Sequence, residues 1–381
     1  MTALATTPIL PSTLRLGAAR LTVTDLDRSV AWYQTALGLR VHDHGATTAA
    51  LGDGSTTVLE LVEDARARPA GRHGGLYHFA LLYPSREELA RAAVRLGRTR
   101  TPIQGASDHK THEAIYLPDP DGNGIELAAD RPRDEWPPPQ VEYASGPAPL
   151  DIDALLATIE GEEPTDHVEP GLVMGHLHLH VGDIDEGLAF YRDVLGFEVR
   201  ANLGSAAFVS AGGYHHHLGF NVWKGRGVGP APDDAVGLRF WTVGLDTPEE
   251  VAAVRGRVVA AGLAVTDVER GFEVRDPWNT AVRIVAAPEH GRAVVTTEKP
   301  SPYLLQVAKH FRHKLPVTFE PEEATIPFRF GAARLHVAGG TLVIDSYAAT
   351  PEDRARVEHV IGSHLERFGQ RDELAVRWSA A

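Results

Sequence analysis

A repeated segment constrains the fold of this chain more than any other feature of its sequence. Residues 25–41 read DLDRSVAWYQTALGLRV and residues 183–199 read DIDEGLAFYRDVLGFEV, with seven of the seventeen positions identical. A second pair of similar segments, DPDGNGIEL at 119–127 and DPWNTAVRI at 276–284, recurs at an offset of 157 residues, against 158 for the first pair. Two matches at nearly the same offset indicate that a whole domain is duplicated.

Each copy is expected to contain two modules that share one plan, a strand followed by a helix and further strands. An alternating strand, AARLTVTD or GHLHLHVGD, precedes a helix that Asp25 or Asp183 caps and that Gly38 or Gly196 ends. The second half of the first copy repeats the plan with the strand GLYHFALLYP, a helix capped by Ser85 and a hairpin around the turn DPDGNG. The predicted fold class is therefore α+β, with four tandem βαβββ modules.

Two proline-containing stretches divide the chain into domains. The copies are assigned to residues 13–131 and 171–288, and the Pro-rich, acidic segment 132–170 between them is interpreted as a linker with one short helix. A second break near 287–302 precedes a small α+β domain, residues 291–381, that does not repeat the module plan. In this domain we expect a helix at 301–313, strands between 315 and 347, a helix at 351–368 and a last strand at 373–378.

Composition limits the chemistry that such a chain can perform. Its 381 residues include 19 histidines and no cysteine, so any metal must be held by histidine and carboxylate. Acidic residues outnumber basic ones by 51 to 37, and the net charge of −14 argues against a nucleic-acid partner. No run of about 18 apolar residues and no leader-like start is present, so we expect no membrane partner and a cytoplasmic location.

The motifs quoted above resemble the vicinal oxygen chelate superfamily, which includes glyoxalases, bleomycin-resistance proteins and extradiol dioxygenases. The segments EAIYLPDPDGNGIELAADRPRDEW, VMGHLHLHVGDIDEGLAFYRDVLGF and GYHHHLGFNVW are similar to catechol 2,3-dioxygenases of the Bacillus type. The resemblance implies two glyoxalase-like domains and a mononuclear metal, usually Fe(II), held by two histidines and one carboxylate. The C-terminal segment is similar to a small bacterial domain family of unknown function.

In the second copy, the resemblance aligns His176 with the first metal ligand. The run after Tyr214 supplies His215 as a further candidate ligand, with His216 and His217 as candidate acid/base residues, and alternation would put His215 and His217 on one face. His178 and His180 are interpreted as polar side chains that face solvent. Asn221 is a candidate substrate-binding residue.

Arg283 occupies the second-copy position that corresponds to Glu126, where the family has its carboxylate. Arginine cannot ligate a metal, but it could bind an anionic substrate. If His176 and one histidine of 215–217 converge on this position, then Arg283→Glu is expected to strengthen metal binding.

The first copy shows the reverse pattern, because Ala18 stands where the second copy has His176. It does carry His78, Glu126 and Glu60, which could form an alternative metal site; Glu126 could equally be a structural carboxylate beside the DPDGNG turn. His109 and His112 are interpreted more simply as loop residues than as supports of a site. Each copy therefore lacks one ligand of a complete set.

Two classes of function remain open from the sequence. The first is an extradiol-type dioxygenase, or a related metal-dependent enzyme, that acts on a small aromatic or diol substrate with Fe(II), or with Mn(II), Ni or Zn. The second is a metal-free binding protein of the resistance type, or a degenerate enzyme, as the replacement of the expected glutamate by Arg283 suggests. A homodimer is compatible with either class.

Overall fold

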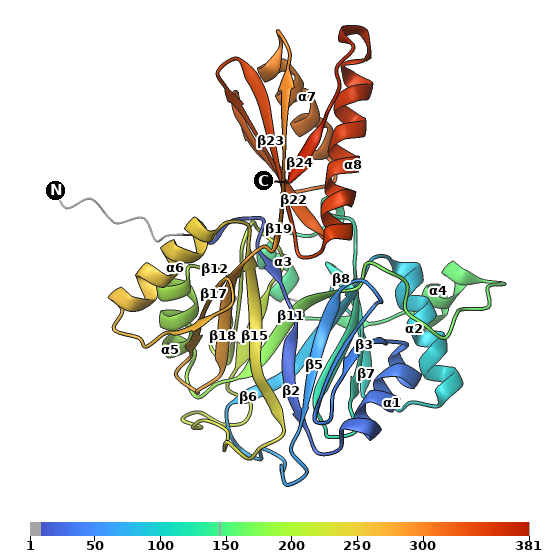
Figure 1. Ribbon diagram of the computed structural model, residues 1–381. Helices are drawn as coiled ribbons and strands as arrows, with labels where there is room; N and C mark the ends of the chain where they lie inside the picture. Colours follow the sequence, from blue (N-terminus) through green and yellow to red (C-terminus); the bar gives the residue numbers. More distant parts are fainter. Residues whose placement is uncertain (1–8, 145, 381) are drawn as a thin grey trace.

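The structure is a computed structural model that describes residues 9–144 and 146–380. The first copy contains the two expected modules in sequence (Figure 1). Their elements are β2 (Ala19–Val23), α1 (Leu26–Leu37), β3 (Arg40–His44), β4 (Thr48–Gly52) and β5 (Thr57–Glu63), then β6 (Gly75–Tyr83), α2 (Arg86–Thr99), β7 (Gly105–Asp108), β8 (His112–Pro118) and β9 (Gly124–Asp130).

The second copy repeats the same order of elements. Its elements are β11 (Val173–His180), α5 (Ile184–Leu188), the π-helical η3 (Ala189–Leu195), β12 (Glu198–Asn202), β13 (Ala206–Ser210) and β14 (Leu218–Asn221), then β15 (Gly237–Leu245), α6 (Pro248–Ala260), β16 (Thr266–Val268), β17 (Gly271–Arg275) and β18 (Ala281–Ala286). The Asp25 and Asp183 side chains cap the first helix of each copy, and Gly38 and Gly196 end it in the left-handed conformation, as predicted.

The strands pair between the copies, and this pairing decides where sites can form. β6 of the first copy lies antiparallel to β11 of the second, and β2 lies antiparallel to β15. Two curved halves of one 18-stranded sheet result. We call β6–β9 with β11–β14 the histidine cup, and β2–β5 with β15–β18 the arginine cup. Each copy thus contributes one module to each cup, while the helices lie on the outer sides of the sheets (Figure 1).

The segment between the copies is packed against them, although the sequence indicated a linker. Within 132–170, β10 (Ala148–Pro149) pairs with β7, and Leu155 of α4 (Ile152–Leu156) is buried. The short elements η1 (Arg133–Glu135), α3 (Pro139–Ala144) and η2 (Ala157–Ile159) complete the segment. A further strand, β1 (Arg15–Leu16), pairs with both β11 and β15 and joins the two cups.

The C-terminal domain is a six-stranded antiparallel sheet with two helices, and it stands on one end of the two cups (Figure 1). Its elements are β19 (Glu289–Thr296), α7 (Pro300–Phe311), β20 (Thr318–Glu320), β21 (Glu323–Phe328), β22 (Gly331–Ala338), β23 (Thr341–Ala348), α8 (Pro351–Phe368), η4 (Gln370–Asp372) and β24 (Trp378–Ala380). The region expected to be a break near 287–302 therefore contains β19, which pairs with β23 and β24. The last strand begins at Trp378 and not at residue 373.

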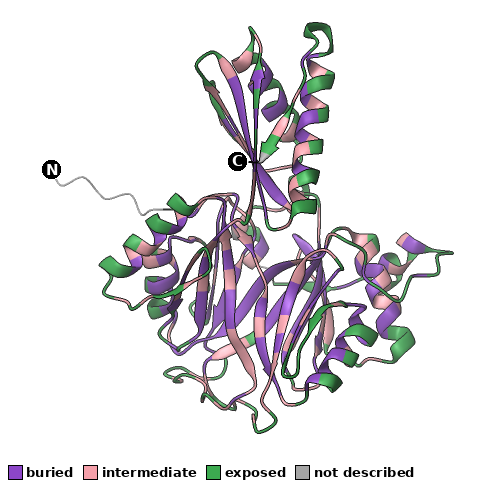
Figure 2. Cartoon of the chain, in the orientation of Figure 1, coloured by how far each residue is buried: buried purple, intermediate pink, exposed green. Residues whose placement is uncertain are grey.

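Burial follows the layers, because the strands are buried along most of their length and the outer faces of the helices are exposed (Figure 2). One hydrophobic core spans both copies and a second core fills the C-terminal domain. Within the described residues, no helix combines the length and apolar character needed to cross a bilayer.

Candidate metal centre

Three side chains from both copies meet on the concave face of the histidine cup. Glu126 on β9 and His176 on β11 both lie opposite Ala80 of β6 in strand register, one on each side, and His78 precedes Ala80 by two residues on β6. Because residues two apart on a strand share a face, all three side chains project to the same side. Among the described residues, His78, Glu126 and His176 are the one group of three whose ligand atoms lie within 4.8 Å of one another.

The distances within this group match the spacing of ligands around one metal ion. The Nε2 atoms of His78 and His176 lie 3.2 Å and 3.1 Å from Oε2 of Glu126. Ligand bonds of about 2.1 Å at right angles would put neighbouring donor atoms about 3.0 Å apart. Two imidazoles and one carboxylate form the donor set typical of non-haem Fe(II) centres with open coordination positions. These residues can therefore hold a divalent metal.

Electrostatics keep the carboxylate of this group ionised. The Glu126 side chain is only 2% exposed. Burial alone would raise the pKa of Glu126, but His176, His112 and His78 together hold it well below its usual value. A buried carboxylate is stable only when it is paired, and here three imidazoles provide the pairing.

Further histidines pack around the ligand group, and one of them, His112, contacts the ligand Glu126 directly. Nε2 of His112, on β8, lies 3.1 Å from Oε1 of Glu126 and fixes the carboxylate orientation. The His112 ring stacks between His109 and His215, with ring centroids 4.5 Å apart on each side. His109 also contacts the Tyr116 hydroxyl at 2.7 Å. The interpretation of His112 as a loop residue was wrong, because it begins β8 and is buried.

His178 and His180 are buried, and the expectation that they face solvent was wrong. The pairing of β11 with β6 and β14 encloses their strand on both sides. His180 Nδ1 lies 2.9 Å from Oδ1 of Asn221, so Asn221 positions this histidine. Nε2 of His178 is buried and has no hydrogen-bond partner in the described part of the chain. Sequence reasoning missed this nitrogen, which lies two residues from His176 on the same face of the strand.

The run His215–His217 does not behave as a strand, because Gly212 and Gly213 adopt positive φ angles of 60° and 66° and break the extended chain before it. The predicted alternation of faces is therefore wrong. His215 and His216 both lie beside the ligand group, with the His216 ring centroid 4.2 Å from that of His176.

The imidazole nitrogens of His215 and His217 contact residues outside the ligand group. His215 Nε2 lies 3.4 Å from Oδ1 of Asp130, and burial lowers the pKa of His215 to about 3. His217 Nδ1 accepts a hydrogen bond from the Ala211 backbone N–H at 3.2 Å. In this arrangement His215 is 3.4 Å from a carboxylate, and neither His215 nor His217 belongs to the ligand group.

Arg283 and Glu60 lie in the arginine cup, away from the ligand group. Arg283 lies opposite the residue two positions after Phe240, and Glu126 lies opposite the residue two positions after His78. The two cups therefore carry different residues at corresponding positions. The Arg283 guanidinium lies 3.5 Å from the centroid of the Phe240 ring and donates to Glu273 at 3.0 Å. Glu60 pairs with Arg20 at 2.6 Å. The charges at the centre of this cup are therefore neutralised within the protein.

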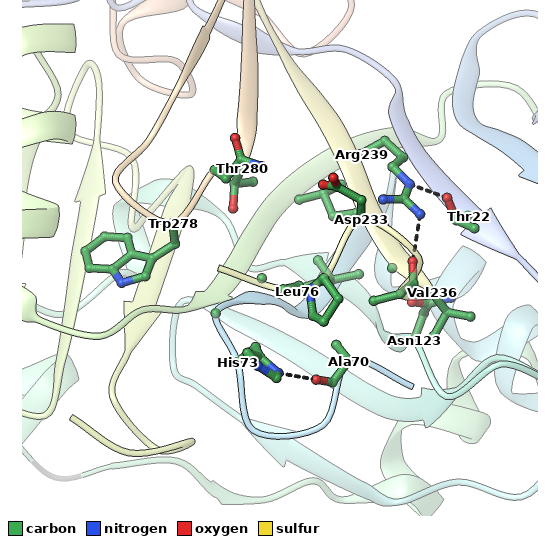
Figure 3. Close-up of a pocket in the computed structure, with 18 of the residues that line it drawn as sticks. Thr22, Ala70, His73, Leu76, Asn123, Asp233, Val236, Arg239, Trp278 and Thr280 are labelled. Atoms are coloured by element: carbon green, nitrogen blue, oxygen red, sulfur yellow. Dashed lines mark hydrogen bonds between the residues drawn. The ribbon is translucent and has the colours of Figure 1, made fainter. Parts of the chain in front are cut away.

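A cavity of ≈ 850 Å³ adjoins the arginine cup (Figure 3). Arg239 donates to the Thr22 hydroxyl and to the Ala235 carbonyl at its wall, and His73 Nδ1 lies 2.5 Å from the Ala70 carbonyl. Of the residues that the structure describes, five basic and five acidic side chains line this cavity, and their charges balance.

Substitution of Arg283 by glutamate should leave the metal content of the protein unchanged. The new carboxylate would lie in the arginine cup beside Phe240 and Glu273, where no histidine completes a ligand set among the described residues. Inductively coupled plasma mass spectrometry on the wild type and this variant, purified identically, measures the result. A second equivalent of metal in the variant would show that the arginine cup still holds a latent site.

Comparison with known proteins identifies the superfamily to which the two copies belong. The model of the Glyoxalase/Bleomycin resistance protein/Dioxygenase superfamily matches residues 15–127 and 173–284, and the chain belongs to this superfamily. Residues 292–379 match a family described as uncharacterized proteins conserved in bacteria (DUF2218). The catechol-2,3-dioxygenase of Bacillus subtilis (strain 168) is 43% identical to the chain over 272 residues, which cover 70% of this chain and 95% of that protein.

Two solved structures align with the two-copy region at low sequence identity. A proposed dioxygenase of Bacillus subtilis subsp. subtilis str. 168 is 16% identical, with a TM-score of 0.49, over 72% of this chain and 86% of that one. Glyoxalase I of Zea mays is 17% identical, with a TM-score of 0.45, over 72% of this chain and 92% of that one.

Proposed function

We propose that the chain is an extradiol-type ring-cleaving dioxygenase that acts on a small catecholic substrate at the histidine cup. The observation that carries the proposal is the buried group His78, Glu126 and His176, which completes a ligand set that neither copy has alone. The name of the Bacillus subtilis relative, a catechol-2,3-dioxygenase at 43% identity, supports this substrate class.

In this proposal His78, Glu126 and His176 would hold Fe(II), which would supply the redox and Lewis-acid chemistry that a reaction between a diol and dioxygen needs. The protein supplies the orientation of the substrate. Nε2 of His178 is available to hydrogen-bond a substrate hydroxyl, because no described residue bonds it. Tyr77 and Trp223 lie with their ring centroids 5.3 Å and 5.5 Å from that of His178, and both are partly exposed. They would flank the apolar ring of the substrate.

The assembled residues also bear on the metal-free alternative. That alternative relied on Arg283 in place of a ligand, but Arg283 lies in the arginine cup and is paired with Glu273. It therefore does not deprive the histidine cup of its carboxylate. His216, beside His176, stays a candidate acid/base residue in our proposal, and His217 does not enter it.

Oxygen uptake tests the proposed reaction. Ring cleavage next to the diol consumes one dioxygen per catechol and places both oxygen atoms in a ring-opened, yellow semialdehyde. Protein reconstituted anaerobically with Fe(II) should consume oxygen and catechol in equal amounts, measured with an oxygen electrode and by absorbance. Metal binding without oxygen uptake, across a panel of substituted catechols, would contradict the dioxygenase and favour another metal-dependent reaction of the superfamily.

A further inference from the structure

A cavity of ≈ 550 Å³ lies at the junction between the C-terminal domain and the two cups, apart from the metal centre. Its volume falls within the range of about 300–1,000 Å³ that is typical of sites for small organic ligands. The copies contribute Leu82 and Met174 to its wall, the segment between the copies contributes Trp136, and the C-terminal domain contributes Leu315, Phe328 and Phe330. A ligand there would contact apolar surface from both parts of the chain.

The charge of this cavity is opposite to that of the protein as a whole. Among the described residues, six basic side chains line it, against two acidic ones, Asp130 and Asp353. The basic residues are Arg15, Arg86, Arg131, Arg133, Arg329 and Lys314. The chain carries a net charge of −14, and the cavity near the arginine cup has equal numbers of both charges. The excess of positive charge is therefore a local property of this junction.

Four of these cations are neutralised by carboxylates of the protein. Arg15 pairs with Asp246, Arg86 and Arg131 pair with Glu113, and Arg329 lies 3.8 Å from Asp130. Arg133 and Lys314 have no carboxylate within 4.0 Å among the residues that the structure describes.

Arg133 is the more enclosed of the two unpaired cations. It donates to the Gly212 carbonyl at 2.7 Å, and its guanidinium lies 5.0 Å from the centroid of the Trp136 ring. Burial lowers the pKa of Arg133 from its ordinary value, so the surroundings penalise its charge in the absence of a counter-ion. Trp136 fixes the plane of the guanidinium beside an aromatic surface, an arrangement that suits a planar anion.

We propose that this junction is a binding site for a small organic carboxylate with a flat, apolar body, recognised by Arg133 and Lys314 and enclosed by Trp136, Phe328 and Phe330. The carboxylate pairs with the two free cations, and the apolar body lies against side chains of the copies and of the C-terminal domain. The site is separate from the metal centre, so it does not depend on the proposed dioxygenase activity.

Binding of 2-naphthoate to the full-length chain, measured by isothermal titration calorimetry, tests the proposal. We expect one site per chain and binding at least about tenfold weaker for the neutral analogue 2-naphthalenemethanol. The double variant Arg133→Gln/Lys314→Gln should also bind naphthoate at least about tenfold more weakly than the wild type. Lys314→Gln alone, at an exposed position, should give a smaller loss and guards against misfolding of the double variant.

Two matched controls test whether binding depends only on the overall charge of the protein or on the metal centre. Arg226→Gln/Lys309→Gln removes the same charge, and Arg226 also donates to a glycine carbonyl but is exposed. This control and His78→Ala should bind naphthoate like the wild type. If His78→Ala loses naphthoate binding and the double variant keeps it, the naphthoate carboxylate binds at the metal centre, and the proposal is overturned. Unchanged binding in the double variant, equal binding of the alcohol, or no binding of either probe would overturn it as well.

Discussion

Replacement of Glu126 by glutamine should reduce bound metal from about one equivalent per chain to below about one tenth. It should also reduce any catechol-dependent oxygen uptake at least about 1,000-fold, equivalent to ~4 kcal/mol of transition-state stabilisation. Glutamine keeps the size of the side chain but removes the charge that His78, His112 and His176 surround. Metal analysis and the oxygen electrode measure the two effects.

Glu113 provides the matched control for this variant. It neighbours His112 on β8 and is also buried, but it pairs with Arg86 and Arg131. Glu113→Gln should therefore lose some stability and keep its metal. If both variants lose metal equally, the loss reflects damage to the fold, and the assignment of Glu126 as a ligand would no longer stand.

Replacement of Asp246 by alanine should destabilise the protein by about 3–5 kcal/mol, because it leaves two arginines without their common partner. The Asp246 side chain is fully buried and accepts hydrogen bonds from Thr13 at 2.5 Å, Arg15 at 2.7 Å and Arg334 at 2.8 Å. Arg334 belongs to the C-terminal domain and also contacts Glu250 of α6. The variant should loosen the contact between this domain and the cups, with a lower urea midpoint and faster limited proteolysis between the two.

Asp267→Ala is the control for this effect. Asp267 pairs with Arg255, but its side chain is 83% exposed. An exposed ion pair contributes about 0.5 kcal/mol or less, so this variant should unfold at nearly the wild-type urea concentration. Equal losses in the two variants would contradict the central role of Asp246.

The modules themselves could be predicted because their signals are local. The capping residues Asp25 and Asp183, the left-handed Gly38 and Gly196 and the DPDGNG turn each act within a few residues of the element that they define. The strand β19 was missed although its residues Ala293 and Val295 are buried and their neighbours are exposed. This alternation was a usable signal, but the proline-containing flanks of the segment obscured it.

The pairing between copies could not be predicted in the same way. Both copies present strands of the same kind, so pairing within a copy and pairing between copies satisfy the same local patterns. The choice is made by contacts between residues distant in the sequence, such as β6 with β11 and β2 with β15. For this reason the ligands could be identified one at a time, whereas their assembly into one group from two incomplete copies required the structure.

The support around the ligands was equally inaccessible from the sequence. From the sequence, His112 was interpreted as a loop residue and His178 as a strand residue that faces solvent, and only the closed histidine cup makes them buried partners of the site. The glycine pair at 212 and 213 was visible before His215, but its effect on the direction of three histidines depends on the loop that it forms.

The central claim is that one metal centre is built from both copies, with ligands His78, Glu126 and His176. X-ray diffraction data from crystals of the metal-loaded protein, collected above and below the absorption edge of the metal, test this claim most directly. We predict one anomalous peak per chain, within about 2.3 Å of His78 Nε2, His176 Nε2 and a Glu126 oxygen. A peak in the arginine cup, or one bound by histidines of 215–217 without Glu126, would contradict it.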